Sequence, residues 1–251
     1  MRILLTNDDG IHAPGMAVLQ ELAAQLSDDV WVCAPSEEQS GAGHSLTLHL
    51  PVRLQKLGEK RYCVTGTPTD SINLALRKLF DDGRPDLVIS GVNAGENLGD
   101  DITYSGTISA AMEAALAGIP AIALSQAFRR NGASFSATEA WGKQVLEPLI
   151  DVAMAKRTLI NVNFPALPAE EVRGIRVVRQ GFHDYSRGSL VEGEDPRGRP
   201  YYWFGLQDAE HTLDHGTDLE AIAEGYIAIT PLQLDLTHHS AIGALAERFT
   251  Q

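Results

Sequence analysis

The chain has 251 residues, of which 44% are hydrophobic and 21% charged, and its formal net charge is −13. This length suits one large α/β domain with a smaller appendage. The negative charge disfavours extended nucleic acid as a partner, because that affinity comes mostly from Lys and Arg contacts with phosphates. No apolar run approaches the ~20 residues that span a bilayer, and no leader pattern opens the chain, so we expect a cytoplasmic protein without a membrane partner.

The first half of the chain alternates short apolar runs with stretches whose apolar residues recur at helical spacing. The predicted strands are residues 2–6, 30–34, 62–65, 86–90 and 121–124. The predicted helices begin at Pro14, after the capping residue Thr67, and at Ile108, where the helix runs to Leu116. This alternation is typical of a Rossmann-like, doubly wound and mostly parallel sheet, so we assign the chain to the α/β class.

The pattern loosens in the second half, after a predicted helix at 141–155 and a predicted strand at 159–162. Residues 181–217 are polar, Gly-rich and irregular, apart from a turn that leads into the aromatic strand 201–204. A strand at 226–230 and a helix from about 240 to 249 complete the predicted elements.

We therefore divide the chain at residue 180. Residues 1–180 form the predicted catalytic core, and residues 181–251 form an arm with the last strand and helix, which packs on the core. A long irregular stretch inside a compact domain is more often a functional arm or an interface than a true coil. The aromatic residues 201–204 then belong to a subunit interface, which we favour, or to a platform that stacks against adenine.

Two adjacent carboxylates, Asp8 and Asp9, follow the first strand within the turn-forming sequence Asn-Asp-Asp-Gly. Neighbouring like charges resist joint ionisation unless a cation or fixed dipoles compensate them. Taken alone, this turn is typical of a solvated loop. Further polar segments, containing Ser40 and Asn93, also follow predicted parallel strands, at the edge where open α/β sheets bind their ligands.

The candidate metal ligands on these segments all offer oxygen. Asp8 and Asp9 supply carboxylates, Ser40 supplies a hydroxyl and Asn93 an amide carbonyl. Such hard donors suit Mg²⁺ or Mn²⁺ and argue against zinc or copper. Because two carboxylates neutralise one dication, we expect one divalent cation per subunit, with positions left open for water and a phosphate oxygen.

A candidate phosphate site precedes the helix predicted from Ile108. Backbone amides at a helix N-terminus bind anions, and the neighbouring hydroxyls add donors. An ordinary helix cap explains Ser-Gly-Thr equally well when it is taken alone. The residues assigned to phosphate binding are Gly41, Asn97, Ser105, Gly106 and Thr107.

Several separated motifs together resemble the SurE, or survival protein E, family of metal-dependent nucleotidases. They run in order through nearly the whole chain, as 7–10, 40–41, 66–68, 90–97, 104–107, 216–218 and 230–232. The resemblance implies hydrolysis of nucleoside monophosphates, with Asp8, Asp9, Ser40 and Asn93 at the metal positions. It also implies a C-terminal arm of β-hairpin and helix that is exchanged between subunits, and hence a homodimer or homotetramer.

We expect release of phosphate from nucleoside 5′-monophosphates by a metal-activated water, with 3′-monophosphates and short polyphosphate as further candidate substrates. The expected catalytic residues are Asp8, Asn93, Ser105 and Thr107. The base, the phosphate position and the cation that are preferred do not follow from the sequence.

The identity of the general acid stays open among Asn97, Asp101 and His44, each of which also has a plain structural interpretation.

Two alternative functions use the same scaffold. One is a receiver-type signalling module, which also carries paired acids that hold Mg²⁺. The other is a nucleotide sensor without catalytic activity.

Overall fold

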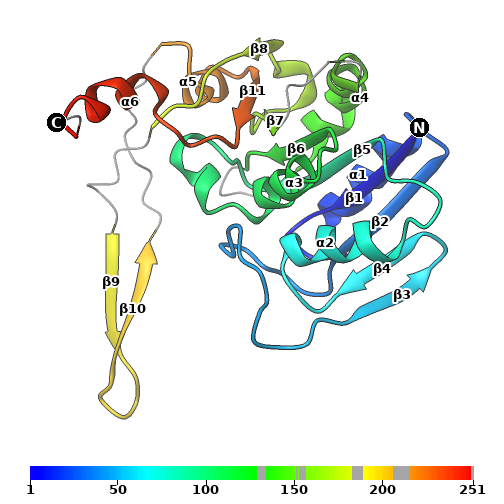
Figure 1. Cartoon of the computed structure of the whole chain (residues 1–251), viewed down its shortest axis with the longest axis horizontal. Helices are drawn as coiled ribbons and strands as arrows, with labels where there is room; N and C mark the ends of the chain where they lie inside the picture. Colours follow the sequence, from blue (N-terminus) through cyan, green and yellow to red (C-terminus); the bar gives the residue numbers. More distant parts are fainter. Residues whose placement is uncertain (129–133, 151, 153–156, 183–188, 206–214, 250–251) are drawn as a thin grey trace.

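The computed structural model describes residues 1–128, 134–150, 152, 157–182, 189–205 and 215–249. One sheet has nine strands in the order β3-β4-β2-β1-β5-β6-β7-β11-β8, and β9 pairs with β10 in a separate hairpin (Figure 1). The strands are β1 (Arg2–Thr6), β2 (Asp29–Pro35), β3 (Leu54–Gly58), β4 (Arg61–Val64), β5 (Leu87–Ala94), β6 (Ala121–Gln126), β7 (Thr158–Phe164), β8 (Ile175–Val177), β9 (Ser189–Glu194), β10 (Pro200–Gly205) and β11 (Ile227–Gln233).

Helices cover both faces of this sheet. They are α1 (Pro14–Ala24), α2 (Pro68–Lys78), α3 (Gly106–Leu116), α4 (Ser136–Ile150), α5 (Asp218–Ala223) and α6 (His239–Ala246), with 3-10 helices η1 (Gly99–Thr103) and η2 (Ala169–Glu171). Side chains of α1 and α4 pack into one core cluster and those of α2 and α3 into another. Within the described residues, no helix combines the length and apolar character needed to cross a membrane.

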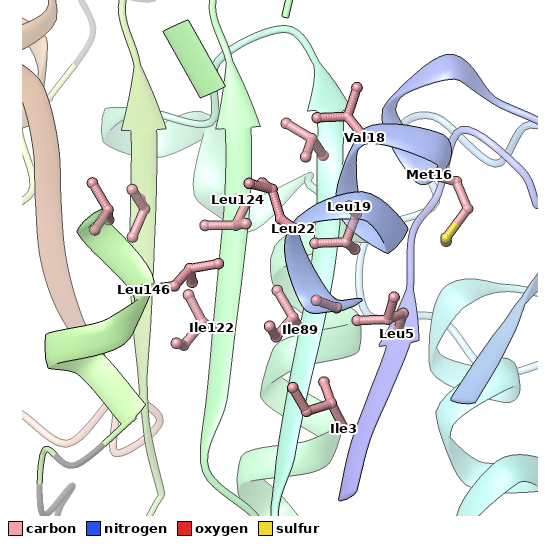
Figure 2. Close-up of a cluster of buried hydrophobic side chains, with 14 of the residues drawn as sticks. Ile3, Leu5, Met16, Val18, Leu19, Leu22, Ile89, Ile122, Leu124 and Leu146 are labelled. Carbon is pink, nitrogen blue, oxygen red and sulfur yellow. The ribbon is translucent and has the colours of Figure 1, made fainter. Parts of the chain in front are cut away.

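The central strands are buried on both faces, as the apolar runs predict. β1 pairs in parallel with β2 and with β5, and Ile3, Leu4 and Leu5 are fully buried. Figure 2 shows Leu19 and Leu22 of α1 pointing at the sheet face that carries Ile89 and Leu124. The predicted Rossmann-like, doubly wound and mostly parallel sheet is therefore confirmed.

β5 extends further than predicted. The apolar pattern in the sequence predicts that this strand ends before Gly91. The strand continues to Ala94, and its register with β6 shifts between Ser90 and Asn93. Gly91 has a φ of +140°, and a Cβ at this position would lie 2.3 Å from the Leu124 carbonyl oxygen. Glycine thus allows β5 to pass close to β6, and Asn93 lies on the strand rather than in the loop that follows.

Three helix boundaries also differ from the prediction. α4 begins at Ser136 instead of 141 and ends at Ile150, while most of the predicted continuation to 155 lies outside the described residues. Its first turn consists of small and polar residues, which carry little apolar periodicity. α3 begins at Gly106, two residues early, and α6 spans His239–Ala246. The short elements β8 and α5 are absent from the prediction.

The hairpin predicted from the turn before the aromatic strand is present. β9 and β10 pair antiparallel, and Figure 1 shows them projecting away from the sheet. Tyr201, Tyr202 and Trp203 are 46%, 54% and 68% exposed. β11 pairs with β7 and β8 inside the main sheet, so residues assigned to the arm complete the core. The division at residue 180 and the exchange of the arm between subunits stay predictions.

Candidate active site

The turn that carries the two adjacent acids lies at the carboxyl end of β1, in the middle of the sheet. The Asn7 side chain donates to the Gly10 carbonyl at 2.8 Å and closes the turn. Gly10 has a φ of +96°, which L side chains rarely adopt. The turn holds Asp8 inward, so that its side chain is only 4% exposed.

Three hydrogen bonds connect this turn to the other predicted site segments. The Gln39 N–H donates to the Asp8 carbonyl at 2.8 Å, next to Ser40. The Ala94 N–H donates to the Asp9 carboxylate at 3.0 Å, next to Asn93. The Thr107 hydroxyl donates to the Asp8 carboxylate. The segments that carry the predicted metal ligands and the predicted phosphate loop therefore meet at the carboxyl edge of the sheet, as expected for an open α/β sheet.

The N-terminus of α3 rests directly against Asp8. Ser105 is the N-cap residue, and its side chain accepts a hydrogen bond from the Ile108 N–H at 3.1 Å. A Cβ on Gly106 would lie 2.7 Å from the Asp8 Cβ. Glycine therefore permits this close approach, and the positive end of the α3 dipole faces the carboxylate.

Burial dominates the electrostatics of the acid pair. Burial, opposed in part by the Thr107 hydrogen bond, raises the pKa of Asp8 to about 6, and the charge of Asp9 adds to the effect. Burial likewise raises the pKa of Asp9, with a further contribution from Glu38. No described Lys, Arg or His forms an ion pair with either carboxylate. Two adjacent carboxylates of this kind, one buried and one half-buried, fit a bound dication.

The two neutral candidate ligands are oriented by neighbours. The Asn93 amide nitrogen donates to the Gly95 carbonyl at 2.9 Å, which leaves the amide oxygen as the ligand atom. The Ser40 hydroxyl donates to the Glu38 carboxylate at 2.8 Å and keeps lone pairs on its oxygen. The described part of the chain contains no group of three or more His, Cys, Asp or Glu side chains that could hold a metal ion together. Carboxylate, hydroxyl and amide oxygens of this composition suit Mg²⁺ or Mn²⁺.

The Gly-rich loop that carries Ser40 lies beside the phosphate loop. The Gly43 N–H donates to the Tyr104 carbonyl at 3.1 Å. Gly41 has a φ of +75°, and a Cβ there would have no neighbour within 4 Å. The space beside Gly41 is thus free for a ligand. Phosphate binding by Gly41 stays a prediction.

The three candidates for the general acid have different surroundings in the structure. His44 Nε2 lies 3.0 Å from Glu113 on α3, and this contact lowers the pKa of the Glu113 carboxyl. The imidazole therefore supports the loop rather than facing Asp8. Asp101 lies half-buried in η1.

Asn97 is a buried anchor, 6% exposed, and not a simple turn residue. Its amide nitrogen donates to the Ser125 hydroxyl at 2.8 Å, and its N–H donates to the Asn163 side chain at 2.8 Å. Its carbonyl accepts from Asn161 at 2.8 Å and from Asn163 at 3.1 Å. Sequence analysis does not identify Asn161 or Asn163, although two asparagines alternate within an apolar strand. Phosphate binding by Asn97 stays a prediction.

Known proteins resemble this chain over nearly its whole length. The family model described as Survival protein SurE matches residues 3–187. A 5′-nucleotidase SurE from Erythrobacter litoralis is 68% identical over 251 residues, covering 99% of this chain and 100% of that protein. Another from Rhizorhabdus wittichii is 58% identical, covering 97% and 98%. The crystal structure of the SurE protein from Aquifex aeolicus superposes with a TM-score of 0.86 at 39% identity, covering 99% of each chain.

Proposed function

The chain belongs to the SurE family, and from this premise we propose that it is a nucleotidase that hydrolyses nucleoside 5′-monophosphates to the nucleoside and phosphate. Full-length similarity to proteins named 5′-nucleotidase SurE supports this activity. Nucleoside 3′-monophosphates and short polyphosphate are further candidate substrates. The observation that carries the proposal is the acid pair of buried Asp8 and half-buried Asp9, which lies at the N-terminus of α3 and has no ion-pair partner among the described residues.

In this proposal Asp8, Asp9, Ser40 and Asn93 hold one divalent cation, Mg²⁺ or Mn²⁺, in each subunit. The shared hydrogen bonds of their segments and the absence of a cationic partner in the described residues support this ligand set. When bound, such a cation supplies Lewis acidity and lowers the pKa of a coordinated water.

The residues at the start of α3 have a separate task. The Gly106 N–H and the Ser105 hydroxyl lie at the start of α3, where the helix dipole favours an anion, and we assign them to the oxygens of the phosphate. Thr107 is assigned to the same site, although its backbone and its hydroxyl both contact Asp8. Because α3 is fixed in the core, these donors are preorganised for the charge that develops as the ester bond breaks. The Thr107 hydroxyl orients the Asp8 carboxylate at the same time.

The receiver-type alternative fits the structure poorly. A receiver module needs a phosphate-accepting aspartate at the carboxyl end of a strand beside the acid pair. Asp86 instead precedes β5, at the opposite edge of the sheet, where its carboxylate accepts the Arg2 N–H at 2.6 Å. A nucleotide sensor would have the same fold and site as the enzyme, so only a measurement of turnover distinguishes the two.

One assay tests the proposal and its alternatives. Phosphate release is measured from a panel of nucleoside 5′- and 3′-monophosphates and polyphosphate, with Mn²⁺, Mg²⁺ or EDTA. We expect repeated turnover with a divalent cation and none with EDTA. Stoichiometric self-phosphorylation would instead indicate the receiver, and binding without release would indicate the sensor.

The proposal also includes a homodimer or homotetramer that acts in the cytoplasm. The exposed aromatic side chains of β10 support a role of the hairpin in subunit contact. Light scattering at micromolar concentration tests this part, and a monomer would contradict it.

A further inference from the structure

A second buried carboxylate lies at the far end of the loop that leads to the phosphate site. Asp218, the first residue of α5, is fully buried. Its carboxylate accepts three backbone N–H groups, from Gly181 at 2.8 Å, Leu219 at 2.9 Å and Gly99 at 3.0 Å. Two of these donors lie far from α5 in the sequence, so the carboxylate joins three separate segments.

Helix capping does not account for this carboxylate. Thr217 already caps α5, since its side chain accepts the Glu220 N–H at 3.3 Å. Burying an ionised carboxylate is costly unless hydrogen bonds compensate it. A buried acid that is not needed for the cap therefore indicates a role in holding its other two partners, Gly99 and Gly181.

The contacts of Asp218 lie on both sides of the segment 182–215, which contains the β9–β10 hairpin and which we name the hairpin arm. The Arg179 N–H donates to the Gly216 carbonyl at 3.1 Å, and the Asp218 N–H donates to the Arg179 carbonyl at 3.0 Å. Gly181 packs so tightly here that a Cβ would lie 2.9 Å from the Leu219 side chain. The chain segments that enter and leave the arm are thus joined at Asp218.

The other partner, Gly99, determines where the phosphate loop begins. Both backbone polar groups of Gly99 are held by residues that flank the hairpin arm, the N–H by Asp218 and the carbonyl by the Gln180 side chain at 2.8 Å. η1 starts at Gly99, and the Tyr104 N–H donates to the Asp101 carbonyl at 3.0 Å at its end. Ser105 follows directly, so this short rigid helix transmits the position of Gly99 to the N-cap of α3.

We propose that Asp218 is a positioning residue for the phosphate-binding end of the active site, which it holds in place from the root of the hairpin arm through Gly99 and η1. This inference rests on the proposed function. The metal ligands Asp8 and Asp9 follow β1 instead, so their placement does not pass through Gly99. Because Thr107 at the start of α3 also donates to the Asp8 carboxylate, loss of Asp218 should weaken phosphate binding by a larger factor than cation binding.

The test compares three variants of the full-length protein. Asp218→Asn places an amide NH₂ against backbone N–H donors and loses part of the anchor. Gln180→Ala removes the side-chain hydrogen bond to the Gly99 carbonyl and leaves the Asp218 carboxylate in place. It therefore tests the role of Gly99 even if Asp218→Asn does not fold. Glu220→Gln is the matched control, because Glu220 lies on the same helix and accepts the Gly216 N–H at 2.6 Å without contacting Gly99.

Three quantities are measured for each variant: the inhibition constant of inorganic phosphate, kcat/KM for a nucleoside 5′-monophosphate, and the Kd of Mn²⁺ by electron paramagnetic resonance. We expect Asp218→Asn to weaken phosphate inhibition and to lower kcat/KM by about 10- to 100-fold, the usual scale for a misplaced binding group. Gln180→Ala should shift both in the same direction by a smaller factor. The Kd of Mn²⁺ should change by a clearly smaller factor than the phosphate constant in Asp218→Asn and Gln180→Ala, and Glu220→Gln should match the wild type.

Failure of the inference and failure of the proposed function are distinguishable. If the wild type turns over nucleotides while a folded Asp218→Asn protein keeps the wild-type phosphate constant, the inference alone is overturned. It is also overturned if Mn²⁺ affinity falls in parallel with phosphate affinity, if all three variants lose activity equally, or if Asp218→Asn fails to fold and Gln180→Ala is unchanged. A wild type that neither hydrolyses nucleotides nor binds phosphate overturns both.

Discussion

Acidic side chains at the two ends of the central strand β1 have pKa values shifted in opposite directions. At the amino end, Asp29 on the neighbouring strand accepts hydrogen bonds from Lys60 at 2.8 Å and from Arg2 at 2.9 Å. These partners, Lys60 first, hold the pKa of Asp29 well below its usual range. At the carboxyl end, burial raises the pKa of Asp8 to about 6, and no Lys, Arg or His of the described residues pairs with it.

This difference separates structural from functional charge within one sheet. The amino end is neutralised by the chain itself, so its ion pairs contribute to stability and need nothing further. The carboxyl end keeps a charge that the described chain does not compensate, which is the state of a site prepared for a ligand. The predictions that follow alter one end at a time.

The largest effect is expected from Asp8→Asn, which removes a carboxylate from the site and keeps the shape of the side chain. Phosphate release at saturating Mn²⁺ should fall by at least about 100-fold, since even the supporting groups of metal sites matter on that scale. Circular dichroism should show an unchanged fold. Wild-type rates in this variant would refute the assignment of Asp8 as a metal ligand.

Gly106→Ala should have the next largest effect on activity, because the added Cβ would lie 2.7 Å from the Asp8 Cβ and forces α3 and the acid turn apart. We expect kcat/KM to fall by about 10- to 100-fold. Gly243→Ala on α6 is the control, since a Cβ there meets no neighbour within 4 Å. Equal activity of the two variants would show that the close approach is not needed.

The stability of the metal-free protein should depend on pH through Asp8. Its folded pKa near 6 exceeds the ordinary 3.8, so the folded state binds the proton more tightly and loses stability as pH rises from about 4 to 7. In EDTA, Asp8→Asn should therefore be more stable than the wild type by up to roughly 3 kcal/mol at pH 7. Urea unfolding at both pH values measures this, and a constant difference between the two proteins would contradict it.

Asp29→Asn should give the smallest effect, and in the opposite sense. The loss of hydrogen bonds to Lys60 and Arg2 should destabilise the fold by about 1 kcal/mol, because the Asp29 side chain is one-third exposed and solvent screens the pair. Activity at saturating Mn²⁺ should match the wild type. A drop in kcat without loss of stability would break the separation between the two ends of β1.

Much of the site could be predicted because its signals are local. Turn formers after an apolar run place Asp8 and Asp9 at the end of β1, and a small polar triplet before an apolar helix places Ser105 at its N-cap. The rule that parallel strands end at a common edge then brings Ser40 and Asn93 to the same place. Each inference uses neighbours a few residues apart.

The supports of the site escaped prediction because they depend on contacts between distant segments. Gly91 looks like the end of a strand until the carbonyl of Leu124 is seen beside it. Asn161 and Asn163 are polar residues in an apolar strand, and nothing near them in the sequence indicates that they bind Asn97.

The sequence by itself determined the order of most elements, the class of the sheet and the oxygen chemistry of the proposed ligand atoms, since periodicity and turn propensity act within one element. Only the tertiary structure decided that Asp8 lies buried against α3, with no cationic partner in the described part of the chain, and that Asp218 binds Gly99 from 119 residues away. The physical reason is that burial and long-range hydrogen bonds arise when elements pack together, and a single element does not encode its distant neighbours.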